Sequence, residues 1–198
     1  MQERNDAFLT TQFPRLIRID QSDGLRLFGF ECGDGWFGII YGVMLLIDRY
    51  ASENSIPIHF RQVKEKFGLL RIYTAGGDEN IALMTDIAEL VSGKLCEMCG
   101  DFGELADVQG RMSVRCSKHV NYELSAPAVY KGNYRKYGQL YAGTIAAVIG
   151  LLGNEAVRWI QAPVRGLGNQ KPLDLLGSIE GCREVLRLIK QLEYGVHV

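Results

Sequence analysis

The chain has 198 residues, and 47% of them are hydrophobic, which suffices for one sizeable core or two small ones. Its formal net charge of −1 excludes the strong positive field of a protein that coats DNA or RNA. The apolar runs 37–47 and 141–152 are shorter than the roughly 20 residues of a membrane-spanning helix, so we expect core helices and no membrane segment.

The first fifty residues predict two short strands and a helix. The strand-like runs 15–20 and 25–30 flank Asp23-Gly24, a pair typical of a hairpin turn. Asp34 is the expected N-cap of a helix that begins near Trp36. The apolar face of this helix comprises Trp36, Ile40, Val43, Ile47 and Tyr50. A side formed by Gly35, Gly38 and Gly42 would let another backbone approach closely.

A second hairpin and a second helix follow. The hairpin has arms 58–63 and 69–73 and a charged, solvated turn over 64–68. His59 lies in the first arm, where we interpret it as a half-buried packing residue. Asp78 is the expected cap of the helix, whose apolar face leads directly into Cys96.

Two pairs of metal-type ligands occupy the middle of the chain, Cys96-Glu-Met-Cys99 and Cys116-Ser-Lys-His119. One tight turn can present two ligands to an ion, and two such turns complete a tetrahedron. The spacing predicts a structural Zn²⁺ bound by Cys96, Cys99, Cys116 and His119, with no position left for a substrate. The alternatives are reduced thiols that meet by coincidence, or a disulfide.

The remaining thiols indicate a compartment. The chain has 5 Cys, and only Cys32 and Cys182 lie outside the ligand pairs. Metal-type spacing with leftover thiols is typical of a reducing environment. The first residues, Met-Gln-Glu-Arg-Asn-Asp, lack the basic and apolar stretches of a signal peptide. We therefore expect a cytoplasmic protein.

Three stretches together carry a resemblance to a known domain. They are 63–73 (Val-Lys-Glu-Lys-Phe-Gly-Leu-Leu-Arg-Ile-Tyr), 95–100 (Leu-Cys-Glu-Met-Cys-Gly) and Cys116-x-x-His119. Over residues 30–120 the chain resembles a small zinc-ribbon domain of uncharacterised bacterial and prophage-associated proteins. This resemblance implies a fold and a metal, but no activity.

Residues 120–133 read as a linker, because Pro127 and Gly132 interrupt a stretch without periodicity. After it the chain is helical, with helices predicted over 134–152, 155–161, 173–176 and 179–194. Asn154, Pro172 and Ser178 are the expected start signals, and Gly153, Gly177 and Gly195 the stop signals. We expect an α+β zinc-binding domain over 1–122 and an all-α domain over 134–198, each with its own core.

The helical half also contains landmarks in a fixed order: Glu155-Ala-x-x-Trp159, Pro163, Leu167-Gly168, Lys171-Pro-Leu-Asp-Leu-Leu176, Gly181, Val185 and Leu192-Glu-Tyr-Gly-Val196. On these residues the segment 134–196 resembles the toxin-binding domain of antitoxins of the Xre/MbcA/ParS type. Val164-Arg165 stand where that family usually has an Asn after the Pro.

The resemblance implies function by inhibition. Members of that family pair with RES-domain toxins, which consume NAD, and the helical domain covers the toxin's active-site cleft. This implies an antitoxin or immunity protein, not an enzyme, whose partner is a cognate RES-type toxin. Family members commonly carry an N-terminal helix-turn-helix that represses their own operon. A zinc-binding segment stands in its place here, which favours an immunity protein.

The landmarks divide into contact residues and framework residues. We expect toxin contacts from Arg165, Asn169, Lys171, Glu193 and Tyr194, because such groups on a rigid frame make interface hot spots. We expect a framework role for Trp159, Pro163, Leu167, Gly168, Pro172, Leu173, Leu176, Gly181, Val185 and Gly195. We also expect residues 134–196 to fold and to bind the toxin on their own.

Two further function classes stay open at this point. A zinc-ribbon transcriptional regulator of its own operon would need more clustered Lys and Arg than the sequence offers, so we expect no operator binding. An enzyme would need a nucleophile–base pair, a phosphate loop or an open metal site, none of which the sequence displays. The oligomeric state is open, a homo-oligomer included.

Overall fold

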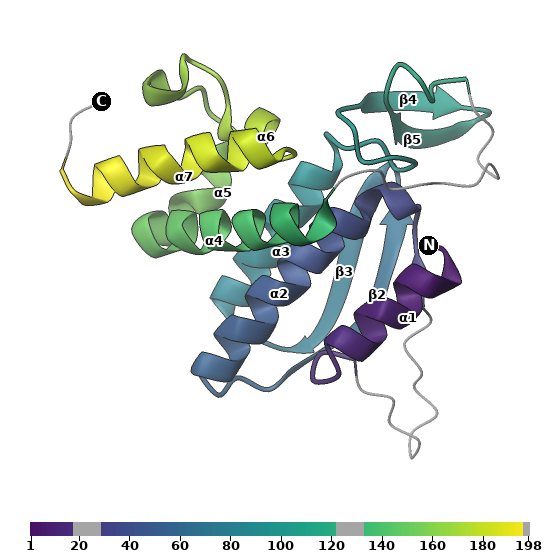
Figure 1. The fold of residues 1–198 in the computed structure, drawn as a ribbon, viewed down its shortest axis with the longest axis horizontal. Coiled ribbons are helices and arrows are strands. Elements are labelled where there is room, and N and C mark those ends of the chain that lie inside the picture. Colours follow the sequence, from purple (N-terminus) through teal and green to yellow (C-terminus); the bar gives the residue numbers. More distant parts are fainter. Residues whose placement is uncertain (18–28, 122–132, 196–198) are drawn as a thin grey trace.

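The computed structural model describes residues 1–17, 29–121 and 133–195 (Figure 1). Its helices are α1 (Glu3–Gln12), α2 (Phe37–Glu53), α3 (Glu79–Ser92), α4 (Tyr134–Leu152), α5 (Ala156–Ile160), α6 (Pro172–Leu175) and α7 (Ile179–Glu193). Its strands are β1 (Phe30–Glu31), β2 (Ile58–Lys66), β3 (Leu69–Gly76), β4 (Glu104–Val108) and β5 (Arg111–Arg115). Short 3-10 helices are η1 (Asp34–Trp36), η2 (Gly153–Glu155) and η3 (Arg165–Leu167). The predicted class, an α+β region followed by helices, is confirmed.

The first sheet has the strand order β1-β2-β3. β2 and β3 form the predicted hairpin, in which Ile58 lies opposite Gly76 and Lys66 opposite Leu69. β1 runs parallel to β2. α3 packs against β3 and α2 packs against α3, so these two helices lie between the sheet and α4 (Figure 1).

The helices begin partly where the sequence predicts. The Asp78 carboxylate accepts a hydrogen bond from the N–H of Ile81 at 3.0 Å, and the Ser178 hydroxyl accepts one from Gly181 at 3.0 Å. The predicted caps Asp34 and Asn154 are wrong. Asp34 is buried in η1 and accepts instead from the N–H of Gln2 at 2.8 Å, while Asn154 lies inside η2.

α4 joins the two halves of the molecule. It packs against α2 on one side and α7 on the other. At the crossing with α2, a Cβ on Gly42 would stand 2.9 Å from the Tyr141 ring and 3.2 Å from Gly138 Cα, so glycine lets the two helices approach this closely. Of the predicted small side, Gly42 therefore meets the backbone of α4, whereas Gly35 lies against the backbone of Cys96 and Glu97.

One continuous cluster of buried apolar residues runs from Leu9 to Ile189. The described residues thus share one main core where the sequence predicts two. The boundaries 1–122 and 134–198 stay a prediction, because residues 122–132 lie outside the described part of the chain.

The last helices are tied to α4 by polar as well as apolar contacts. The Tyr137 hydroxyl donates to the carbonyl of Leu176 at 3.0 Å, and the Thr144 hydroxyl donates to that of Cys182 at 3.1 Å. Gly181 lies directly against the carbonyl of Leu175, which leaves no room for a Cβ. These contacts fix α6 and α7 on one side of α4.

The N-terminal segment differs from expectation. Residues 3–12 form α1, a helix that the sequence analysis does not predict, and 15–17 form a turn rather than the start of a strand. Most of the predicted strands over 15–20 and 25–30 lies in 18–28, outside the described residues. The run from Tyr134 to Ile160 is long and apolar enough to cross a membrane by length and composition, a property that core helices share. Here α4 packs between α2 and α7.

Candidate metal centre and binding surface

The predicted ligands converge. Atoms of Cys96, Cys99, Cys116 and His119 that can bind a metal all lie within 4.8 Å of one another. The Sγ atoms of Cys99 and Cys116 are 3.8 Å apart, and His119 Nδ1 lies 3.6 Å from Cys96 Sγ and 3.3 Å from Cys116 Sγ. Tetrahedral zinc, with bonds of about 2.3 Å to sulfur and about 2.0 Å to nitrogen, separates two sulfurs by about 3.8 Å and sulfur from nitrogen by about 3.5 Å. The four residues therefore fit a zinc ion.

The backbone holds both ligand pairs in tight turns. The N–H of Gly100 donates to the carbonyl of Cys96 at 2.8 Å, and the N–H of His119 donates to that of Cys116 at 2.9 Å. Gly100 has φ +80°, a conformation that glycine adopts without strain, and lets the chain turn away from the ligands. The ligand positions thus follow from local turns that the spacing predicts.

The metal-free thiols differ in acidity. Burial raises the pKa of Cys99 to about 12. Burial also raises the pKa of Cys116, but hydrogen bonds from the backbone of Lys118 and His119 and from the neighbouring thiols lower it below its usual value overall. Zinc binds thiolates, so loading the site releases protons.

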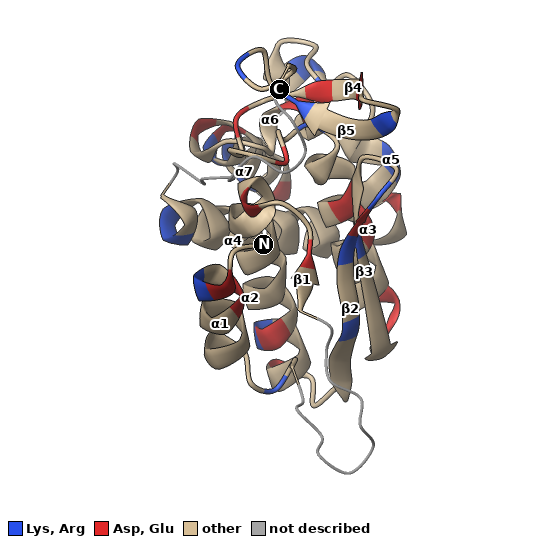
Figure 2. Cartoon of the chain, turned by 90° about the vertical axis from the view of Figure 1, so that its right-hand side faces the viewer, with Lys and Arg blue, Asp and Glu red and all other residues tan. Residues whose placement is uncertain are grey.

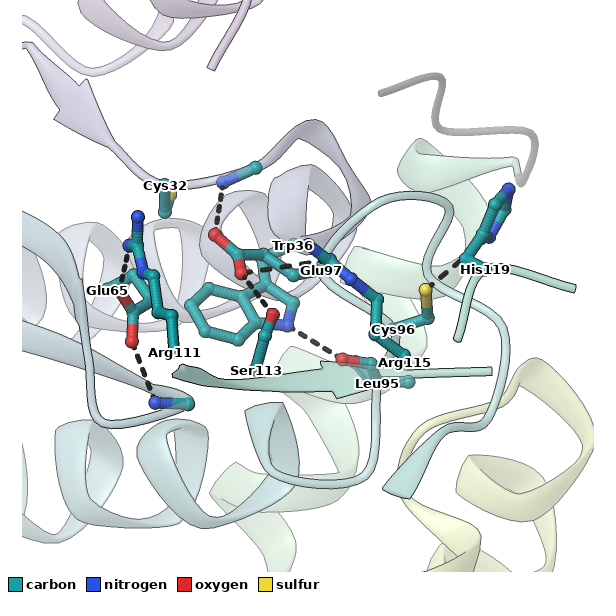
Figure 3. Close-up of polar contacts among 12 residues, drawn as sticks. Cys32, Trp36, Glu65, Leu95, Cys96, Glu97, Arg111, Ser113, Arg115 and His119 are labelled. Carbon is teal, nitrogen blue, oxygen red and sulfur yellow. Dashed lines mark hydrogen bonds and ion pairs between the residues drawn. The ribbon is translucent and has the colours of Figure 1, made fainter. Parts of the chain in front are cut away.

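A buried carboxylate between the first two ligands connects the metal turn to the rest of the molecule. Glu97 accepts hydrogen bonds from the N–H of Gly33 at 3.0 Å and from the Ser113 hydroxyl at 2.9 Å (Figure 3). Arg115 Nη1 lies 3.9 Å from the same carboxylate, and both side chains are buried. The Glu97 carbonyl also accepts from the N–H of Gly35 at 2.8 Å.

Trp36 makes the second connection. Its indole N–H donates to the carbonyl of Leu95 at 2.9 Å, immediately before the first ligand. Sequence reasoning places Trp36 in the core, which is correct, but it misses Glu97, Ser113 and Arg115. The available signal is weak: a charged residue inside a metal turn is ordinarily a solvated one, and only its burial reveals the role.

The second candidate site is the loop between α5 and α6. Val164 donates to the carbonyl of Gln170 at 3.0 Å, which closes the loop, and Gly166 packs on Leu188 of α7. Arg165, Asn169 and Lys171 are exposed on it. Asn169 has φ +62°, and Asn tolerates this left-handed conformation better than most residues. The loop is therefore a closed turn anchored on a helix.

Glu193 and Tyr194 lie at the end of α7, and Tyr194 is 85% exposed. A small hollow between the loop and α7 is lined by Gly166 and Gln191 among others, and Tyr194 follows Gln191 by about one helical turn. The structure brings Arg165, Asn169 and Lys171 together on one loop and leaves Glu193 and Tyr194 on a neighbouring element. Their role as contacts stays a prediction.

The expected framework residues occupy mixed positions. Leu167, Pro172, Leu173, Leu176, Gly181 and Val185 are buried, Trp159 is half-buried, and Pro163 is exposed. Gly168 has φ +64° after η3 and Gly195 has φ +70° after α7, left-handed conformations that glycine adopts without strain. Most of this set thus lies between helices, and Pro163 lies at the surface.

Comparison with known proteins addresses the helical segment. Residues 148–195 match the family model described as the antitoxin Xre/MbcA/ParS C-terminal toxin-binding domain. The chain is also 40% identical over 53 residues to antitoxin Xre of Yersinia enterocolitica serotype O:8 / biotype 1B (strain NCTC 13174 / 8081). That alignment covers 25% of this chain and 36% of the antitoxin's length. No solved structure matches. The C-terminal segment is thus similar to an antitoxin's toxin-binding domain, which supports an antitoxin role and implies a toxin as the partner.

Proposed function

We propose that this protein is an antitoxin or immunity protein that neutralises a cognate RES-type, NAD-degrading toxin by binding over its active site. The observation that carries the proposal is the match of residues 148–195 to a toxin-binding domain. The family model is described as a toxin-binding domain, and the relative is named an antitoxin. The RES class of the toxin and the blocking of its active-site cleft are our proposal. The protein acts by binding, not by catalysis.

The shape of the helical segment supports binding. The loop 164–170 is closed by backbone hydrogen bonds and anchored on α7, so the backbone that carries its exposed side chains is ordered before any partner arrives. A surface ordered in advance loses less conformational entropy on association. A cleft that binds the phosphates of NAD is lined with positive charge or donors, which Glu193 suits as an acceptor. Arg165 and Lys171 suit acceptors around the cleft.

The metal has a structural role in this proposal. Zinc held by three thiolates and one imidazole has no open position for substrate. When bound, the ion supplies cross-linking of two turns, and Glu97 and Trp36 link those turns to β5 and to the start of α2. We propose the cytoplasm as its location, since reduced thiols are needed to bind the ion.

An operator-binding regulator finds little support in the charge distribution. On the side shown in Figure 2, basic residues on β2, β3 and β5 lie among acidic residues on β1, β4 and α3. Several of the basic groups are paired, such as Arg71 with Glu89 at 2.7 Å and Arg111 with Glu65. We expect no sequence-specific binding to the promoter of its own operon.

Co-expression tests the proposed function. Cells expressing a cognate RES-domain toxin should lose NAD and stop growing, and co-expression of this protein should restore both growth and NAD. The purified proteins should also form a complex, and a Glu193→Lys, Tyr194→Ala variant with an unchanged melting temperature should protect less well. A chain that neither binds the toxin nor restores NAD refutes the proposal.

A further inference from the structure

β4 and β5 pair antiparallel and form a hairpin between the two ligand pairs, which we call the metal-binding hairpin. A groove lies between this hairpin and α6. We call it the hairpin groove and define its walls by Lys94, Phe102, Leu105, Val120 and Asp174. Its volume is about 590 Å³. Figure 1 shows α6 beside this hairpin.

The hairpin groove is bordered by exposed apolar side chains. Phe102 is 50% exposed, Leu105 52% and Val120 43%. Single exposed apolar residues are normal on a protein surface, but a gathering of them around one hollow is typical of an interaction site.

The two walls are fixed to each other. Lys94 Nζ and Asp174 Oδ1 form an ion pair of 2.8 Å across the junction. Gly177, just after α6, lies against the side chains of Leu95 and Phe102, where a Cβ would stand 2.8 Å and 3.1 Å from their nearest atoms. The groove is thus a preformed feature, which a partner can occupy without paying to order it.

The position of the groove indicates its occupant. α6 lies inside the segment 148–195 that matches a toxin-binding domain, and Asp174 of α6 forms part of the groove wall. The exposed Lys171 immediately precedes α6. A partner seated on the loop 164–171 therefore needs to extend across only one helical turn to reach the groove.

We propose that the hairpin groove is a second contact site for the toxin and receives a large apolar side chain from an extended toxin segment. Lys94 and Asp174 pair with each other at the rim, and Glu104 and Arg115 also line the groove. The exposed apolar surface comes from Phe102, Leu105 and Val120, and this surface favours an apolar side chain as the occupant. The metal-binding half thereby becomes part of the inhibitory surface. This inference rests on the proposed function.

Binding of the inactivated RES-domain toxin to full-length variants tests the inference. Phe102→Asp and Val120→Asp each place a charge in the groove and should weaken the toxin complex tenfold or more. The matched control is Met112→Asp, which changes a 39% exposed apolar residue of the same hairpin outside the groove and should alter affinity less than twofold. Zinc content and melting temperature verify that each variant is folded. Val120→Asp serves as the second variant because the Phe102 ring also packs near Gly177.

The outcomes separate this inference from the proposed function. If the wild-type protein binds the toxin and both folded groove variants bind it with the same affinity, the inference is wrong and the proposed function stands. Absence of wild-type binding overturns the proposed function and the inference with it. If Val120→Asp dissolves a self-associated form in sedimentation without affecting toxin affinity, the groove is a contact between copies of this chain and the inference is wrong.

Discussion

The buried carboxylate of Glu97 connects the first metal turn to two other parts of the chain, the segment before α2 and β5. It accepts from Gly33 before α2, from Ser113 of β5, and lies 3.9 Å from Arg115. Glu97→Ala leaves the Arg115 charge buried without an opposing charge, a change that typically costs about 3–5 kcal/mol. We expect a loss of that order in the free energy of unfolding, measured by urea denaturation of the zinc-loaded protein. Glu97→Gln keeps the shape of the side chain and one acceptor oxygen, so its free energy of unfolding should fall less than that of Glu97→Ala.

The matched control for Glu97 is Glu104, an exposed glutamate at the start of β4. Glu104→Ala should change the free energy of unfolding by less than about 0.5 kcal/mol, because surface substitutions generally have small effects. Equal stabilities of Glu97→Ala and Glu104→Ala would show that the buried carboxylate contributes nothing net.

The two non-ligand cysteines predict a reactivity pattern. Burial raises the pKa of Cys182 to about 12 and raises that of Cys32 as well. At pH 8 a thiol with a pKa near 12 is ionised in only about one molecule in ten thousand, and the thiolate is the reactive form. In the zinc-loaded protein, iodoacetamide should therefore modify neither residue until denaturant is added, as followed by mass spectrometry. Rapid modification of Cys182 in the native protein would contradict its buried position.

At the scale of elements, the metal-binding residues form a small apolar cluster that is separate from the main core. The cluster comprises Cys96, Met98, Cys99 and Cys116. Structural zinc supplies on the order of 10 kcal/mol to such a unit. Removal of zinc by a chelator, or Cys99→Ser, should thus raise hydrogen exchange over 96–119 and leave α2 and α4 protected.

Elemental analysis provides the accompanying check on the metal. We expect one zinc per chain in the wild-type protein and none after chelation. A protein that purifies without zinc, or that shows the same exchange over 96–119 with and without the chelator, would argue for reduced thiols without a metal.

The crossing of α2 and α4 predicts opposite effects for two glycines of one helix. A Cβ on Gly138 would stand 2.5 Å from the buried Tyr41 ring, whereas a Cβ on Gly143 meets nothing within 4 Å. Gly138→Ala should lower the free energy of unfolding by about 1–3 kcal/mol through overpacking. Gly143→Ala should raise it by up to about 1 kcal/mol, since Ala is the better helix former. Thermal unfolding of the two variants measures the difference, and equal shifts would place the helices further apart than described.

Across the whole molecule, the sequence predicts local features better than distant pairings. The convergence of Cys96, Cys99, Cys116 and His119 was predictable because residue type and spacing are set within two short turns. α1 was not predicted, because its packing depends on residues far along the chain: the Phe8 ring contacts those of Phe37, Tyr41 and Tyr134. The small side of α2 predicts a close neighbour but carries no information on which helix that is. The roles of Glu97 and of Asp174 in the groove wall also depend on contacts between distant parts of the chain, so they could not be predicted from the sequence.

The shared core leads to the last prediction, which concerns cutting the chain in two. The sequence alone favours an independent segment 134–196, but α4 packs against α2 as well as against α7. A fragment of residues 133–195 would expose the α2-facing side, including Tyr141, which is fully buried in the whole chain. We expect this fragment to melt broadly, without a cooperative transition, and to bind the toxin at least tenfold more weakly than the full chain.

A nicked protein is the control for this comparison. A protease site inserted after residue 127 allows the full chain to fold first and to be cleaved afterwards. Because α2 and α4 share one core, the two pieces should stay together on gel filtration and keep the affinity of the intact protein. Pieces that separate spontaneously, or an isolated fragment that melts cooperatively and binds as tightly as the full chain, would show that two independent domains exist and that the continuous core contributes little to the stability of either.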